Sequence, residues 1–104
     1  MDIQLKRGLL DILILASLYK VDSYGYKIVK DVSLHISITE STLYPILKRL
    51  ELNGCVEVYT KEYNGRLRKY YKITHLGIKK INDFKEEWKE VIKVYKYIEG
   101  ETHE

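Results

Sequence analysis

The chain has 104 residues, of which 45% are hydrophobic and 32% are charged, and its formal net charge is +3. This length predicts a single domain, and this composition is ordinary for a folded protein, so it argues against disorder. Cys55 is the only cysteine, which excludes an intramolecular disulfide, and we expect it to be a small buried hydrophobic residue in a reducing compartment.

The first predicted helix covers about residues 5–19 and is apolar nearly all the way round, with Leu9 and Leu13 among its apolar residues. A helix of this kind is buried on more than one side, and in so short a chain we expect the second side to face another subunit. The apolar run at residues 9–18 is too short to cross a bilayer, and no signal-peptide cleavage pattern follows it. We therefore expect a cytoplasmic protein without a membrane partner.

The second predicted helix ends at about Ser33, and either Asp22 or Ser23 is expected to cap its start. Its apolar residues recur at helical spacing. Gly25 is unfavourable inside a helix by about 1 kcal/mol relative to Ala. Two interpretations of this glycine stay open: a neighbouring backbone approaches closely at Gly25, or the packed fold simply tolerates it.

The third predicted helix starts after Thr39, an N-cap candidate, and ends near the helix-stop pair Asn53-Gly54. Its apolar stripe consists of Leu43, Leu47 and Leu50, with Ile46 beside them. Its other side carries Ser41, Tyr44, Pro45 and Lys48. Because Pro45 lacks a backbone N–H, we expect a bend or a 3₁₀ start at that point.

A β-hairpin follows, with strands at about residues 55–61 and 68–73 joined through Asn64-Gly65, a pair that tolerates positive φ at both turn positions. Residues 59–72 carry five basic side chains against Glu62 alone. The basic side chains are Lys61, Arg66, Arg68, Lys69 and Lys72. A basic patch confined to one segment is typical of a phosphate-binding surface, although a solvated hairpin is the alternative.

Thr74 is expected to cap a last helix that reaches about Ile98. Its apolar residues alternate spacings of three and four, the pattern of a helix that packs against another helix. These residues are Ile81, Phe84, Trp88, Val91, Tyr95 and Ile98. We divide the chain into residues 1–74, which form a DNA-binding unit, and residues 75–104, a dimerisation helix packed on the same domain.

Three helices followed by a two-stranded hairpin are the order of a winged helix-turn-helix, a mainly α fold with a small β-hairpin, here with a long C-terminal dimerisation helix. In such folds the third helix presents its polar face to the major groove, where Ser41, Thr42, Tyr44 and Lys48 can bind bases or phosphates. An enzyme is not expected, because the histidines His35, His75 and His103 are scattered. No metal-ligand cluster or cofactor motif is present in the sequence.

Several short segments together resemble the successive motifs of PadR-type transcriptional regulators. They occur in the family's order and spacing, and the resemblance covers about residues 5–98. Thr74 and Gly77 match the start of the family's last helix. The segments are residues 5–10 (LKRGLL), 22–26 (DSYGY), 41–45 (STLYP), 47–51 (LKRLE) and 65–71 (GRLRKYY).

This resemblance implies a homodimeric winged-helix protein that binds inverted repeats in double-stranded DNA, usually as a repressor. The implied DNA-contacting residues are Tyr24, Ser41, Thr42, Tyr44, Lys48, Arg66, Arg68 and Lys69. The implied dimer interface combines the first and last helices through Leu9, Leu13, Ile81, Phe84, Trp88, Val91 and Tyr95. The short turn at residues 63–65 argues against deep insertion of the wing into the minor groove.

Three alternatives remain at this point. In some relatives an aromatic residue of the last helix stacks on a small planar effector, and Trp88 is comparable, but a structural position in the dimer seam is favoured for it. The second alternative is a winged-helix protein-interaction module without specific DNA binding, which usually lacks both the basic wing and the polar helix face. The third is another winged-helix regulator family, which would share DNA binding but differ in its dimer.

Overall fold

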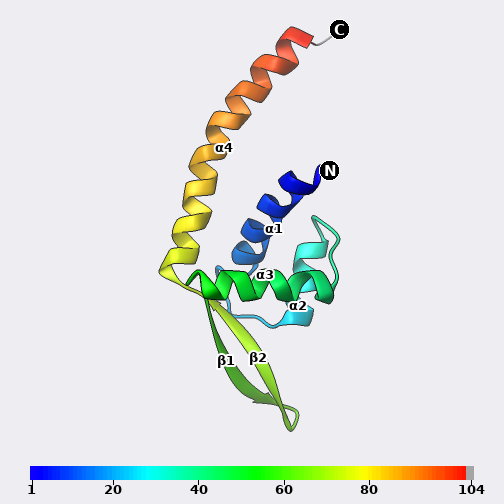
Figure 1. Cartoon of the computed structure of the whole chain (residues 1–104), viewed down its shortest axis with the longest axis vertical. Helices are drawn as coiled ribbons and strands as arrows, with labels where there is room; N and C mark the ends of the chain where they lie inside the picture. The colour runs from blue at the N-terminus through cyan, green and yellow to red at the C-terminus, as the bar shows by residue number, and fades with distance from the viewer. Residues whose placement is uncertain (103–104) are drawn as a thin grey trace.

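The computed structural model describes residues 1–102, which form four α-helices and one two-stranded antiparallel sheet. The elements are α1 (Ile3–Ser17), α2 (Gly25–Ser33), α3 (Glu40–Leu52), β1 (Val56–Tyr63), β2 (Arg66–Ile73) and α4 (His75–Thr102). Helices α1 to α3 form the body, the β-hairpin projects from it, and α4 extends in the opposite direction (Figure 1). The described part of the chain measures 60 × 26 × 21 Å. This arrangement confirms the predicted winged helix with a long C-terminal helix.

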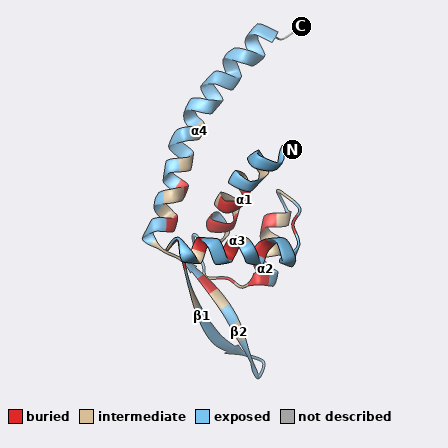
Figure 2. Ribbon diagram, in the orientation of Figure 1, coloured by how far each residue is buried: buried red, intermediate tan, exposed pale blue. Residues whose placement is uncertain are grey.

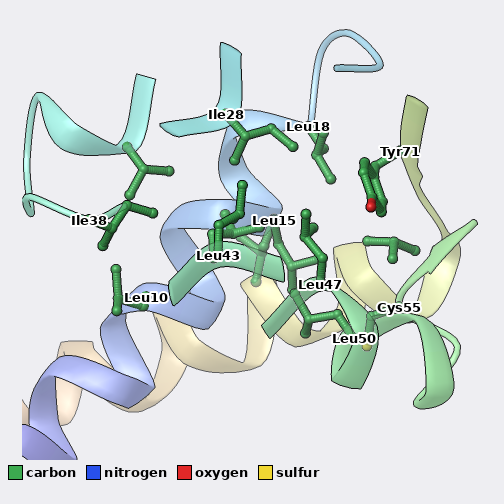
Figure 3. Packing of buried hydrophobic residues seen from close by; sticks show 14 residues of the cluster. Leu10, Leu15, Leu18, Ile28, Ile38, Leu43, Leu47, Leu50, Cys55 and Tyr71 are labelled. Atoms are coloured by element: carbon green, nitrogen blue, oxygen red, sulfur yellow. The ribbon is translucent and has the colours of Figure 1, made fainter. Parts of the chain in front are cut away.

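The body owes its cohesion to apolar side chains that come from all of its elements. Ile14 and Leu15 of α1 pack with Ile28 of α2 and with Leu43 and Leu47 of α3, and none of these is more than 1% exposed. Figure 3 shows that Leu50, Cys55 and Tyr71 close the side of this cluster next to the hairpin. The apolar stripe predicted for the third helix therefore faces the core, and Cys55 is buried as expected.

The first helix is longer at its start than predicted and shorter at its end. It begins at Ile3, because the Asp2 carboxylate accepts hydrogen bonds from the backbone N–H groups of Gln4 and Leu5, each at 3.1 Å. It ends at Ser17 instead of residue 19. A side chain that accepts bonds from free helical N–H groups fixes a helix start, and Asp2 supplies this cap.

The predicted capping of α2 by Asp22 or Ser23 is wrong. Tyr24 occupies the N-cap position and makes no side-chain capping bond. The Asp22 carboxylate instead accepts a hydrogen bond from the Tyr59 hydroxyl at 2.7 Å. The backbone of Ser23 exchanges two hydrogen bonds with Tyr71, at 3.1 and 2.7 Å, and so pairs with β2 at the base of the hairpin. Both candidate caps thus bind the wing.

Helix α3 starts and stops where the sequence predicts. The Thr39 hydroxyl accepts a hydrogen bond from the Thr42 N–H at 3.3 Å, and Gly54 ends the helix with a φ of +76°. The predicted 3₁₀ start at Pro45 is wrong, because the α-helix runs through this residue from Glu40 to Leu52. Pro45 lies in the second turn, where its missing N–H removes a single helical hydrogen bond.

The hairpin strands are longer than predicted and reach the turn itself. They pair in register from Val56 opposite Ile73 to Tyr63 opposite Arg66. Asn64 and Gly65 have φ values of 51° and 77°, so the two-residue turn with positive φ at both positions is confirmed. Because side chains alternate along a strand, the two faces of this wing carry different residues.

The joint between the body and α4 is tight. The Thr74 hydroxyl donates a hydrogen bond to the Gly54 carbonyl and accepts one from the Gly77 N–H at 3.2 Å, which confirms Thr74 as the cap. A Cβ atom at Gly77 would overlap the Cys55 carbonyl oxygen, so only glycine fits there. Beyond the joint, α4 buries Ile81, and residues 89–102 are all exposed (Figure 2).

Candidate nucleic-acid interface

The outward face of α3 carries the polar side chains that the sequence places there. Ser41 and Lys48 are exposed, and Lys48 lies 3.9 Å from the Glu51 carboxylate on the same helix. At the start of the helix, the Thr39 hydroxyl lies 2.9 Å from the Ser41 hydroxyl and 3.3 Å from that of Thr42. The N-terminal turn of α3 therefore presents a group of hydroxyls to solvent.

A cleft of about 670 Å³ separates the start of α2, the flank of α3 and the wing. Glu40 is its only acidic residue, and three basic side chains of the wing also line it. Five of the eight predicted DNA-contacting residues line this cleft: Tyr24, Tyr44, Arg66, Arg68 and Lys69. The structure thus brings the wing and one flank of the third helix together around a single basic cleft.

Thr42 lies on the other flank of α3, apart from this cleft. It lines a second cleft of about 500 Å³ together with Arg7 of α1 and Arg49 of α3. At 100° per residue, Ser41 and Lys48 project between the two flanks. The predicted set is therefore spread over three sides of α3, the start of α2 and the wing. Arg7 and Arg49 are basic neighbours to which the sequence assigned no role.

Gly25 contacts a side chain and not a neighbouring backbone, which corrects the close-approach interpretation. A Cβ atom at this position would overlap the Tyr44 hydroxyl, so the glycine lets the Tyr44 ring lie across the start of α2. Burial, and next the nearby Glu40 carboxylate, raise the pKa of Tyr44 above 10.0. The Tyr44 hydroxyl thus stays protonated at neutral pH and keeps a hydrogen to donate.

The half-buried Arg68 lies among aromatic rings. Its guanidinium carbon is 3.9 Å from the ring centroid of Tyr24 and 3.9 Å from that of Tyr63. Sequence reasoning named Arg68 and Tyr24 but missed Tyr63. The alternation of tyrosine with basic residues along one face of both strands could have indicated it, because diagonal neighbours across a hairpin can touch.

An ion pair that the sequence does not predict joins α1 to α3. The guanidinium of Arg49 makes two hydrogen bonds to the Asp11 carboxylate, at 2.7 and 2.9 Å. Asp11 is only 8% exposed. The hydrogen bond to Asp11 is the main cause that raises the pKa of Arg49. The pair fixes the exposed helix α3 to the first helix of the body.

The residues predicted for a dimer interface differ in their burial within one chain. Ile81 belongs to the core of its own chain, whereas Leu9 and Leu13 are half-buried. Phe84 and Trp88 are also half-buried, and their rings contact each other at 5.5 Å between centroids. The two remaining members of the predicted interface, Val91 and Tyr95, are exposed.

Within residues 1–102, no group of three or more His, Cys, Asp or Glu side chains is arranged to hold a metal ion. His103 lies outside the described residues. None of the helices in this part of the chain has the length and hydropathy needed to cross a membrane.

Comparison with known proteins identifies related regulators. The model of the transcriptional regulator PadR-like family matches residues 14–83. A transcriptional regulator from Clostridium thermocellum is 38% identical, with 93% of this chain and 96% of that chain covered and a TM-score of 0.82. A PadR family transcription regulator from hypervirulent Clostridium difficile is 36% identical, with 88% and 98% covered and a TM-score of 0.81.

A more distant structure contains DNA. It is the Bacillus subtilis PadR in complex with operator DNA, which is 27% identical. The alignment covers 73% of this chain and 46% of that chain, with a TM-score of 0.66.

Proposed function

Because the chain belongs to the PadR-like family of transcriptional regulators, we propose that it is a repressor that binds an inverted-repeat operator in double-stranded DNA as a homodimer. The family consists of regulators and not enzymes, in agreement with the sequence-based expectation. The observation that carries the proposal is the basic cleft between α3 and the wing, which five of the predicted DNA-contacting residues line. The operator complex of the Bacillus subtilis relative supports the same use of the fold.

In the proposed complex, the outward face of α3 enters the major groove. Ser41 and Lys48 project from that face, and the hydroxyls at its N-terminal turn bind phosphates or base edges. The wing lies along the flanking phosphates. Two subunits pair through α1 and α4, so that the two α3 helices lie about one DNA turn apart, roughly 34–36 Å. Binding of this dimer across a promoter blocks transcription.

The test is the binding of the purified protein to the DNA upstream of its own gene, measured by fluorescence anisotropy over a range of salt concentrations. We expect nanomolar affinity that exceeds the affinity for scrambled DNA and falls steeply as salt is added, because phosphate contacts release counterions. Charge reversal of the wing at Arg66, Arg68 and Lys69 should abolish binding.

The matched control reverses Lys79, Lys89 and Lys93, which project from the side of α4 away from its apolar seam. It changes the net charge by the same amount and should leave affinity within about twofold, apart from a small loss of long-range attraction. Equal loss in both variants would reject the wing as the binding surface. Weak binding to every DNA sequence would favour the protein-interaction module.

A small planar effector is a separate hypothesis, and it rests on Trp88. A structural position in the dimer seam is favoured for Trp88, and the contact between the rings of Phe84 and Trp88 suits that position. Trp88 is the only tryptophan, so its fluorescence reports directly on this position. Quenching by planar amphiphilic cations, together with release of operator DNA, would support an effector site; unchanged fluorescence would remove the hypothesis.

A further inference from the structure

The position of Arg68 differs from that of an ordinary exposed DNA-binding arginine. A guanidinium is planar and has two faces, and the rings of Tyr24 and Tyr63 each lie 3.9 Å from its central carbon. A ring whose centroid lies this close to the carbon packs against a face of the guanidinium and not against its N–H edge, so two such rings cover the two faces. The contact between a cation and an aromatic ring is attractive on both sides, so the guanidinium plane is held in place before any ligand arrives.

Arg68 and the rings of Tyr24 and Tyr63 form a clamp, and further aromatic side chains connect this clamp to the body of the protein. The rings of Tyr24 and Tyr70 meet in a T-shaped contact at 5.7 Å between centroids, and Tyr70 stacks on Tyr59 at 5.6 Å with an angle of 12°. The hydroxyl of Tyr59 in turn donates a hydrogen bond to Asp22, next to the start of α2. Arg68 is therefore fixed relative to α2 and to the base of the wing.

Only the N–H edge of Arg68 remains available, because both faces of its guanidinium are covered. The guanidinium with a ring on each face forms a stack thicker than the minor groove of B-DNA, which is about 6 Å wide, so Arg68 cannot enter that groove in this conformation. The edge of a guanidinium is a fork of parallel donors that matches the oxygens of a phosphate. Arg68 lines the basic cleft, where Glu40 is the only acidic residue.

We propose that Arg68 binds a backbone phosphate of DNA at this cleft, and that Tyr63 and Tyr24 are positioning residues that hold its guanidinium for that contact. This inference rests on the proposed function. It replaces the direct DNA contact expected for Tyr24 with an indirect one, and it adds Tyr63, a half-exposed residue of the wing. Phosphate binding fixes register and carries no base sequence, so the clamp contributes to affinity for any duplex.

The experiment measures binding to a random-sequence duplex of about 30 base pairs at several salt concentrations, starting at about 50 mM. Tyr63→Ala removes one ring of the clamp without changing the charge, and Tyr63→Phe keeps the ring. Both are compared with Tyr97→Ala, which removes an exposed tyrosine on α4. Tyr63→Ala is also combined with Arg68→Gln, and thermal unfolding verifies that each variant folds.

We expect Tyr63→Ala to weaken binding roughly five- to tenfold. It should also reduce the slope of the salt dependence by about 0.9 for each phosphate that the protein no longer binds. Tyr63→Phe and Tyr97→Ala should stay within about twofold of the unmodified protein, since neither removes a ring from Arg68. Because Tyr63 acts through Arg68, Tyr63→Ala should cause no further loss when Arg68 is already glutamine.

The clamp would be overturned if Tyr63→Ala caused an equal loss of affinity with Arg68 present and with Arg68→Gln, or if it left the slope of the salt dependence unchanged. Either result would leave the proposed function intact. An unmodified protein that binds no duplex at low salt would overturn the proposed function, and the clamp with it. The two failures are therefore distinguishable in the same titration.

Discussion

The two ends of this elongated chain expose their side chains in different ways. At the wing, exposed aromatic residues contact basic side chains of the same chain, as Tyr63 does with Arg68. Along the far half of α4, the exposed residues include the aliphatic side chains of Val91, Ile92 and Ile98, and residues 89–102 are all exposed to solvent (Figure 2). One end is completed by its own chain, whereas the other presents apolar surface of the kind that a partner subunit covers.

The sharpest test of this difference changes the apolar seam of α4. We expect Val91→Asp together with Tyr95→Asp to convert the proposed dimer into a monomer, because two carboxylates would be buried without partners in the proposed interface. Sedimentation velocity measures the change. Operator affinity should fall by about 100-fold or more, since the second half-site is no longer bound by the same particle.

The matched control for the seam is Lys93→Asn together with Tyr97→Asp. It changes the charge by the same amount, and its two positions project to the opposite side of α4. This variant should remain dimeric. If both double variants dissociate, or neither does, the seam is not the dimer interface, and the exposed apolar residues need another explanation.

The joint between the two regions is the next place to test. Gly77→Ala should destabilise the protein by roughly 1–3 kcal/mol, because the new Cβ would overlap the Cys55 carbonyl and force the start of α4 away from the body. Gly100→Ala, in the same helix with no atom within 4 Å of the new Cβ, should be neutral or stabilising by up to about 1 kcal/mol. Denaturant unfolding compares the two. Equal effects would mean that α4 is not fixed at this joint.

Breaking the ion pair between Asp11 and Arg49 tests how much the contact between α1 and α3 contributes to the stability of the body. Asp11→Ala should cost about 1–2 kcal/mol, less than for a fully buried pair, because the Arg49 side chain is 47% exposed and keeps contact with water. Asp31→Ala breaks the exposed pair with Lys27 and should cost less than about 0.5 kcal/mol. Thermal unfolding measures both losses of stability. Similar values would show that the burial of Asp11 does not make its ion pair more stabilising than an exposed one.

The smallest expected effect concerns alkaline pH. Burial is the main cause that raises the pKa of Tyr71 above 10.0, with the neighbouring Tyr44 and Glu51 as further causes. A folded pKa above the unfolded value means that this contribution to stability is complete below pH 10 and is lost as the pH rises through the folded pKa. Tyr71→Phe should therefore lose less stability than the unmodified protein above about pH 10. Tyr97→Phe, at an exposed position, should not differ from the unmodified protein.

Features that depend on neighbouring residues could be predicted from the sequence. The cap at Thr39, the stop at Gly54 and the turn at Asn64 depend on a few adjacent residues, and all three are confirmed. The apolar stripe of α3 follows from helical periodicity and does face the core. The wing could be predicted for the same reason, because its strands and the basic side chains along them form a local pattern in the sequence.

Features that depend on distant residues could not be predicted. Asp22 has the chemistry of a cap, but Tyr59, far along the sequence, uses its carboxylate. Gly25 is explained only by the Tyr44 ring, and Asp11 only by Arg49. In each case two residues meet because the fold places them together, and local sequence patterns do not indicate such a contact.

The charge of the wing has a consequence for solubility. A two-stranded hairpin has two free edges, and unpaired backbone groups on an edge can add strands from other molecules. Ser23 covers the base of the β2 edge, and beyond it lies Lys69, with Lys61 and Arg68 beside it. Lysine and arginine at such positions oppose strand addition by mutual repulsion. The side chains that suit a polyanion thereby also keep separate copies of this hairpin from aggregating.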